Sequence, residues 1–147
     1  MPTIPPLVLL GAAAVAVTAV IVFVRLRERR LRNKLRASAD ALGYQPLAAP
    51  PVWLTAAARP GLPETGASGL VATNVFSKAS EDGAMRVVAT VHYLVGGASR
   101  RHALRRVIAV DLISGKTPQA QVHPERDDLP RAYESLMKQT FPTVQSG

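Results

Sequence analysis

The chain has no cysteine, and only seven of its 147 residues are aromatic. Without cysteine it forms no disulfide and has neither a thiolate nucleophile nor a zinc site with sulfur ligands. None of the aromatic residues lies between Arg25 and Arg36, the most basic segment of the chain. Because nucleic-acid-binding surfaces combine basic residues with aromatic or base-reading side chains, this pattern predicts no nucleic-acid binding.

Sequence motifs of catalysis are equally scarce. The chain has no G-x-S-x-G sequence, and the Gly-Gly pair at 96–97 is not followed by the Lys-Ser or Lys-Thr pair of a phosphate-binding loop. The histidines His92, His102 and His123 lack helical zinc-ligand spacing, although a hairpin at 96–97 would bring the first two together. Asp111, the one acid in an apolar strand-like run, either faces solvent or meets an arginine across the sheet. We therefore expect no catalytic residue, cofactor or metal site.

Charge is absent from Leu7 to Val24, a run of eighteen residues. As a helix this run is about 27 Å long, close to the hydrocarbon thickness of a bilayer. It predicts a transmembrane helix over 7–24, preceded by a short external tail at 1–6. Two alternatives are a cleaved signal peptide, which normally carries its positive charge before the apolar run, and a buried helix of a soluble protein.

Basic residues follow the apolar run at once. They are Arg25, Arg27, Arg29, Arg30, Arg32, Lys34 and Arg36, against the single acid Glu28. Basic residues beside a span stay on the cytoplasmic side, so we expect the N-terminus outside and a cytoplasmic C-terminal domain, in a bacterial inner membrane. This segment carries +6 of the net charge of +8. The seven side chains are therefore predicted to contact anionic lipid headgroups, and the rest of the chain is nearly neutral.

Small residues recur along the apolar run at helical spacing. They are Gly11, Ala12, Ala14, Ala16, Thr18 and Ala19. Such residues let a second helix approach closely, which predicts packing against other membrane helices; a simple compositional bias toward alanine is the alternative.

A second helical stripe lies beyond the membrane segment. Leu31, Leu35, Ala39 and Leu42 share one face of a basic juxtamembrane helix over 25–43, which Gly43 ends. This stripe either meets a partner helix or lipid surface, or folds back onto the chain's own domain.

Residues 44–69 contain five of the twelve prolines, which predicts a proline-rich hinge. A short helical piece over 52–58 is compatible with this density. Trp53, the only tryptophan, either covers the sheet that follows or contacts a membrane interface or a partner.

Period-two patterns predict strands over 70–76, 85–95, 103–113 and 119–122, joined by turns at Asp82-Gly83, Gly96-Gly97 and Ser114-Gly115. A helix capped by Asp127 or Asp128, with Pro130 in its first turn, is predicted to continue to about Thr140. The expected fold class is α+β: a transmembrane helix, then a cytoplasmic domain over 70–147 with an antiparallel sheet of three or four strands packed with a C-terminal helix.

Four arginines, Arg100, Arg101, Arg105 and Arg106, flank the predicted hairpin at 96–97. They either contact a partner, phosphate or lipid, or protect a sheet edge from pairing.

Together these patterns favour a non-catalytic accessory subunit, which packs against the integral subunits of a larger inner-membrane complex and stabilises its assembly. Respiratory and photosynthetic complexes often carry such subunits, and the sequence selects neither type. The alternative is a membrane-tethered binding module that self-associates or recognises a soluble partner or anionic lipid.

Overall fold

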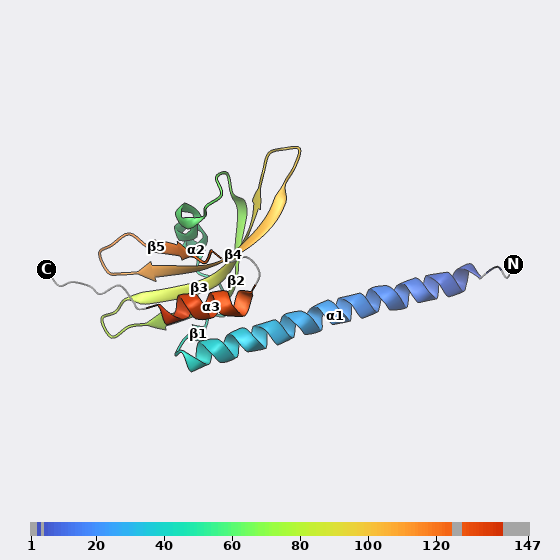
Figure 1. Cartoon of the computed structure of the whole chain (residues 1–147), viewed down its shortest axis with the longest axis horizontal. Helices are drawn as coiled ribbons and strands as arrows, with labels where there is room; N and C mark the ends of the chain where they lie inside the picture. Colours follow the sequence, from blue (N-terminus) through green and yellow to red (C-terminus); the bar gives the residue numbers. More distant parts are fainter. Residues whose placement is uncertain (1–2, 4, 125–127, 140–147) are drawn as a thin grey trace. The chain divides into compact units, whose positions relative to one another are not determined.

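The computed structural model describes residues 3, 5–124 and 128–139 and divides the chain into two compact units, Met1–Lys34 and Leu35–Gly147 (Figure 1). The elements follow in the order α1 (Pro6–Ala41), β1 (Gln45–Pro46), α2 (Val52–Ala58), the 3-10 turn η1 (Arg59–Gly61), β2 (Ser68–Ala79), β3 (Met85–Val95), β4 (His102–Leu112), β5 (Gln119–Val122) and α3 (Leu129–Lys138).

The helical part of the first unit is the N-terminal portion of α1, up to Lys34. This helix is long and apolar enough to cross a membrane, with a mean hydropathy of 2.9 over its best eighteen-residue window. The core helix of a soluble protein and a signal sequence meet the same criteria of length and composition. A soluble core helix is mostly buried, however, whereas none of this window is buried within the chain.

The last turns of α1 belong to the second unit. Leu35 and Ala39 are fully buried there, so this part of the leucine stripe packs on the chain's own domain. Gly43, at φ +80°, ends the helix, because the Tyr44 amide donates to the Ala39 carbonyl and the Gly43 amide to that of Asp40. This pair of bonds is a Schellman motif, which requires a residue in the left-handed region.

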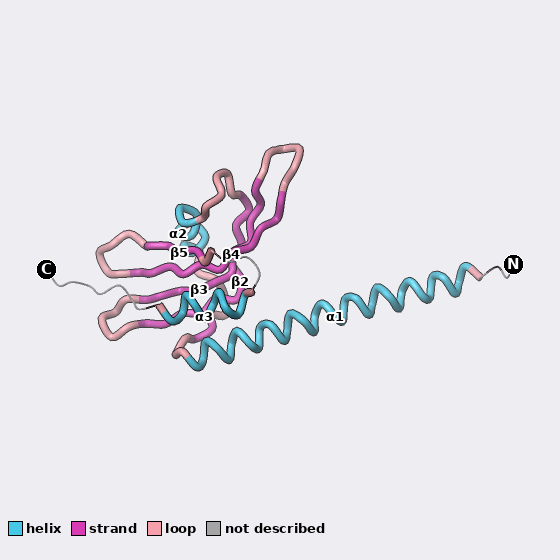
Figure 2. The backbone as a smooth tube through the Cα atoms, in the orientation of Figure 1, coloured by secondary structure: helices cyan, strands magenta, loops and turns pink. Residues whose placement is uncertain are grey.

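The sheet is an antiparallel meander of five strands in the order β1-β2-β3-β4-β5 (Figure 2). The predicted number of three or four strands is therefore too low. β1 was missed because it is a two-residue edge strand that contains Pro46, and neither length nor composition signals such a strand. The other strands lie where the period-two patterns predict them, and the α+β fold class is confirmed.

The proline-rich segment is part of the compact unit that contains the sheet. α2 and η1 cover one sheet face, where Leu54, Ala58 and Leu62 are buried against the side chains of the central strand. This core face is formed by alternating residues of β3, and of β4 beside it: Val87, Ala89, Val91, Tyr93, Ile108 and Val110. Trp53 is partly buried against the same core, as expected for a residue that covers the sheet.

The opposite face is covered by α3. Tyr133 packs edge-on against Phe76, with ring centroids 5.8 Å apart. Its hydroxyl donates to the Asn74 carbonyl at 2.8 Å and accepts from Thr90 at the same distance. Asn74 has φ 49°, at an irregularity in the pairing of β2 with β3, so the tyrosine anchors α3 to this bulge. Asp128 caps α3; the alternative cap Asp127 and the predicted end at Thr140 lie outside the described residues.

Candidate functional site

The most exposed part of the sheet is the hairpin that joins β3 to β4. The two strands stay paired up to Val95 and His102, and the hairpin extends beyond the other strands of the domain (Figure 1). Gly96 closes it at φ +125°, where a Cβ atom would lie 2.1 Å from the carbonyl oxygen of Arg100. Only glycine fits this close approach of two backbone segments.

One of the four arginines predicted near this hairpin is internal. Arg106 forms an ion pair with Glu64 at 2.5 Å, and its side chain is only 12% exposed. Tyr93 donates to the other oxygen of Glu64 at 2.5 Å and accepts from Arg106. Burial alone would raise the pKa of Glu64, but the bonds from Tyr93 and Arg106 outweigh burial and hold this pKa below its usual value. The cluster fixes the loop before β2 to the sheet.

The other three arginines are exposed. Arg100 and Arg101 lie in the turn and Arg105 lies on β4. Within residues 3, 5–124 and 128–139, no carboxylate lies within ion-pair distance of any of them. Three of the four arginines therefore form an exposed basic surface, to which Arg106 does not belong. Their closeness in the sequence gives no sign of this difference.

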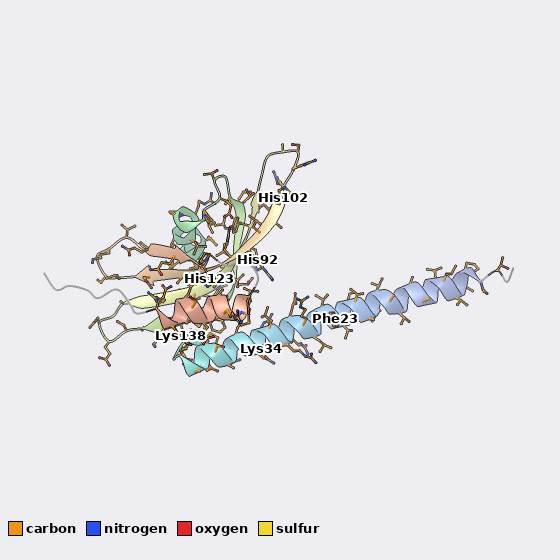
Figure 3. The ribbon with its side chains drawn as sticks, in the orientation of Figure 1. Phe23, Lys34, His92, His102, His123 and Lys138 are labelled. Carbon is orange, nitrogen blue, oxygen red and sulfur yellow. The ribbon has the colours of Figure 1, made fainter. Side chains whose placement is uncertain are left out.

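His92 joins this basic surface. It lies directly opposite Arg105 in the sheet register, and its ring contacts the Thr73 hydroxyl at 3.0 Å. Partial burial lowers the pKa of His92, and the neighbouring Arg105 lowers it further. His102 lies opposite Val95, so the hairpin does not pair it with His92 as the sequence suggested; Figure 3 shows the two rings apart.

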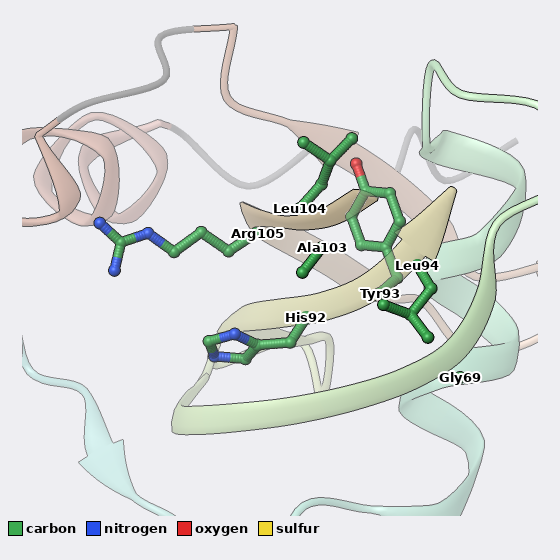
Figure 4. Close-up of a pocket in the computed structure, with 7 residues that line it drawn as sticks. All are labelled: Gly69, His92, Tyr93, Leu94, Ala103, Leu104 and Arg105. Atoms are coloured by element: carbon green, nitrogen blue, oxygen red, sulfur yellow. The ribbon is translucent and has the colours of Figure 1, made fainter. Parts of the chain in front are cut away.

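An open depression of about 430 Å³ lies at the same end of the sheet. It is lined by Gly69, His92, Tyr93, Leu94, Ala103, Leu104 and Arg105, drawn in Figure 4. His92 and Arg105 extend to the same side of the hairpin in this view. The lining contains two basic side chains, several apolar side chains and no acid. Its chemistry therefore suits a ligand that carries an anionic group next to an apolar part.

A second polar network is fully buried beneath α3. Arg86 and Asp111 are 1% and 2% exposed, and their two parallel bonds measure 2.5 Å and 2.7 Å. Arg86 also donates to the carbonyls of Leu136 and Gln139, at the end of α3. Asp111 thus meets an arginine across the sheet, the second of its two expected roles. The pair anchors the C-terminal end of the helix, where carbonyl groups lack partners within the helix.

Tyr44 completes the surroundings of this pair. Its hydroxyl donates to the Met137 carbonyl at 3.1 Å. Burial raises the pKa of Tyr44, and the nearby Arg86 reduces that shift. The network joins the loop after α1, two strands and α3, and every group in it serves the packing of the domain.

The residues predicted to pack against other membrane helices all lie exposed on α1. Thr18 donates back to the Ala14 carbonyl at 2.8 Å, which satisfies its hydroxyl within the helix. The seven basic residues predicted at lipid headgroups are also exposed on α1. No group of three potential metal ligands comes together in the described parts of the chain.

No protein-family model matches the chain, and neither a curated protein nor a solved structure is significantly similar to it.

Proposed function

We propose that the chain is a non-catalytic, single-pass accessory subunit that packs against the integral subunits of a larger bacterial inner-membrane complex. Its N-terminus would lie outside and its α+β domain in the cytoplasm. The observation that carries this proposal is the apolar segment of α1, whose eighteen-residue window is not buried by any described residue. Leu7 is 81% exposed and Phe23 67%, and an exposed apolar surface of this kind supports contact with a bilayer or with other membrane helices.

The sequence around the apolar segment supports an uncleaved anchor. The basic residues follow the segment, which is the reverse of the order in a secretory signal. In addition, α1 continues without a break to Ala41, and Leu35 and Ala39 are buried in the core of the domain. The same helix thus links the apolar segment covalently to the folded domain.

A tethered binding module is the second candidate function. It is favoured by the exposed basic end of the sheet, which serves no packing role in the domain. In this alternative the helix only anchors the chain, and the domain recognises a partner or anionic lipid.

The two candidate functions can be distinguished by purifying the full-length chain from its native membrane in mild detergent. Mass spectrometry then identifies the proteins that accompany it. We expect a fixed set of multi-pass proteins at near-equal stoichiometry. A triple variant with Ala12, Ala16 and Ala19 replaced by leucine should lose these partners but remain in the membrane, because close helix approach needs small residues.

The matched control replaces Val17 and Ile21 by leucine on the opposite helix face and should keep the partners. Recovery of the wild-type chain alone, or as a homo-oligomer, would contradict the subunit proposal and favour the binding module.

A further inference from the structure

We propose that the basic hairpin end of the sheet binds the phosphate groups of anionic lipids in the membrane that anchors the chain. We call this surface the hairpin patch; its members are the three exposed arginines Arg100, Arg101 and Arg105 and the neighbouring His92. The inference rests on the proposed membrane anchor but not on the identity of any partner subunit. It adds a second membrane contact, made by the folded domain itself, to the contact of the juxtamembrane helix.

Among the described residues, no carboxylate forms an ion pair with an arginine of the hairpin patch. No aspartate or glutamate occurs from Gly83 to Val110, a segment that contains five arginines. Arg86 is buried in an ion pair with Asp111, and the partly buried Arg106 forms an ion pair with Glu64. The remaining three arginines are exposed, and no described carboxylate lies within ion-pair distance of them. Within the described part of the domain, Arg86 and Arg106 are thus neutralised, whereas the three arginines of the hairpin patch are not.

The packing of the sheet leaves this surface open. The face beneath α3 is buried at Val88 and Thr90, where Tyr133 bonds to the threonine. Two residues further along β3, His92 is exposed, and Arg105 beside it is exposed as well. In the part of the domain that the structure describes, α3 covers the strands only up to this point. Side chains of the hairpin patch are therefore accessible to a ligand.

The shape and chemistry of the hairpin patch fit a phospholipid headgroup. A guanidinium group binds two phosphate oxygens through parallel hydrogen bonds, which makes arginine well suited to phosphate. The open depression beside Arg105 adds Leu94 and Ala103, which are apolar neighbours for the glycerol region of a lipid. His92 contributes a further ring nitrogen near the same site.

A bilayer fits this surface better than an acidic protein does. Binding energy at protein interfaces is concentrated in a few anchors, most often tryptophan, tyrosine and arginine in well-packed, desolvated pockets. The one aromatic residue of the depression, Tyr93, is 2% exposed and bonded to Glu64. A surface with arginines but no exposed aromatic anchor gains its binding energy from charge, and a membrane offers a continuous layer of anionic charge.

Because the chain is anchored in the membrane, even a weak contact between the hairpin patch and lipid is enough to keep the patch at the membrane surface. A domain tethered beside a bilayer meets its surface at a high effective concentration, so a modest intrinsic affinity gives high occupancy. Each arginine near an anionic surface contributes roughly fivefold to the equilibrium constant of this contact. Loss of all three should therefore release the hairpin from the membrane without any effect on the anchor.

The test uses full-length protein in nanodiscs, because the absence of cysteine allows a single label at a chosen site. Ala98→Cys places a fluorophore in the hairpin turn, and Ser114→Cys places it in the turn at the other end of β4. Quenching by lipids that carry a headgroup spin label reports whether each turn lies at the membrane surface. Nanodiscs of neutral and of anionic lipids are compared, and assembly into nanodiscs independently reports the anchor.

We expect strong quenching of the Ala98→Cys label on anionic lipids, weak quenching on neutral lipids, and weak quenching of the Ser114→Cys label on both. The R100Q/R101Q/R105Q variant should lose the quenching. The matched control K116Q/R131Q/K138Q, which removes the same charge elsewhere on the domain, should retain it.

Equal quenching on neutral and anionic lipids, or quenching that survives the arginine substitutions, overturns the lipid contact. An unquenched Ala98→Cys label on anionic nanodiscs also overturns it, and this result would favour an acidic protein as the partner of the hairpin patch. Failure of the chain to assemble into nanodiscs overturns the membrane anchor instead, so the two failures are distinguishable.

Discussion

Removal of the Asp111 carboxylate should destabilise the domain strongly. In an Asp111→Ala variant, the guanidinium of Arg86 stays buried and loses two bonds, of 2.5 Å and 2.7 Å. Its bonds to the Leu136 and Gln139 carbonyls remain but do not neutralise its charge. Loss of one partner from a buried ion pair costs about 3–5 kcal/mol. Because small domains are stable by only about 5–15 kcal/mol, this change removes a large share of the total.

The double variant R86M/D111L provides the decisive comparison. Removal of both charges also removes the cost of burying them, so we expect a loss of only about 1–2 kcal/mol, from the helix-end carbonyls that lose their donor. The two component single variants, R86M and D111L, should each cost more than the double variant. A coupling free energy of at least about 2 kcal/mol between the two sites follows from these values.

The assay is urea unfolding of the full chain in detergent, followed by fluorescence of Trp53, the only tryptophan, which packs against the core. The control is Lys138→Gln, which breaks the exposed pair with Glu134 and should leave the urea midpoint nearly unchanged. Additive effects of the two single substitutions, or an Asp111→Ala variant as stable as the control, would refute the reasoning.

Three further predictions concern the hairpin and its supports. Glu64→Gln should cost about 1 kcal/mol near neutral pH. Because the folded pKa of this carboxyl is lowered, its contribution is present above the usual pKa and is lost as pH falls through the folded value; unfolding curves of both forms should therefore converge in acid, and a constant difference would contradict the ion pair. Gly96→Ala should cost about 2–3 kcal/mol through its positive φ and a carbonyl 2.1 Å away, whereas Gly97→Ala, with open space around it, should be nearly neutral in the same unfolding assay. Arg105→Gln should raise the depressed pKa of His92 toward its ordinary value in an NMR titration, and an unchanged pKa would show that the two side chains do not interact.

Local patterns predicted much of the fold. The run at 85–95 alternates two sets of side chains and is flanked by glycine turns, and it forms β3 with the same bounds. Asp128 followed by Pro130 predicts the start of α3. A helix cap and a first-turn proline can be recognised from neighbouring residues alone, without knowledge of the tertiary structure. β1 had no such signal, since two residues form a strand only where a neighbouring strand offers an edge.

The candidate site was predicted only in part. The sequence placed four arginines at one hairpin but could not tell that Arg106 differs from the others. Its partner Glu64 is 42 residues away, within a segment whose prolines predict a hinge. The ion pair exists because η1 and the loop after it pack on the sheet, a contact that no local pattern encodes.

By itself, therefore, the sequence determined the apolar segment of α1, the basic residues that follow it, and the strands and turns of the meander, because each depends on neighbouring residues. Only the tertiary structure decided which arginines are neutralised and which are exposed. Arg86 meets Asp111 through the register of β3 with β4, and Arg105 lies beside His92 through the same register. A shift of one residue in that register would send every side chain of a strand to the opposite face, so the pairing of charges follows from the assembled sheet.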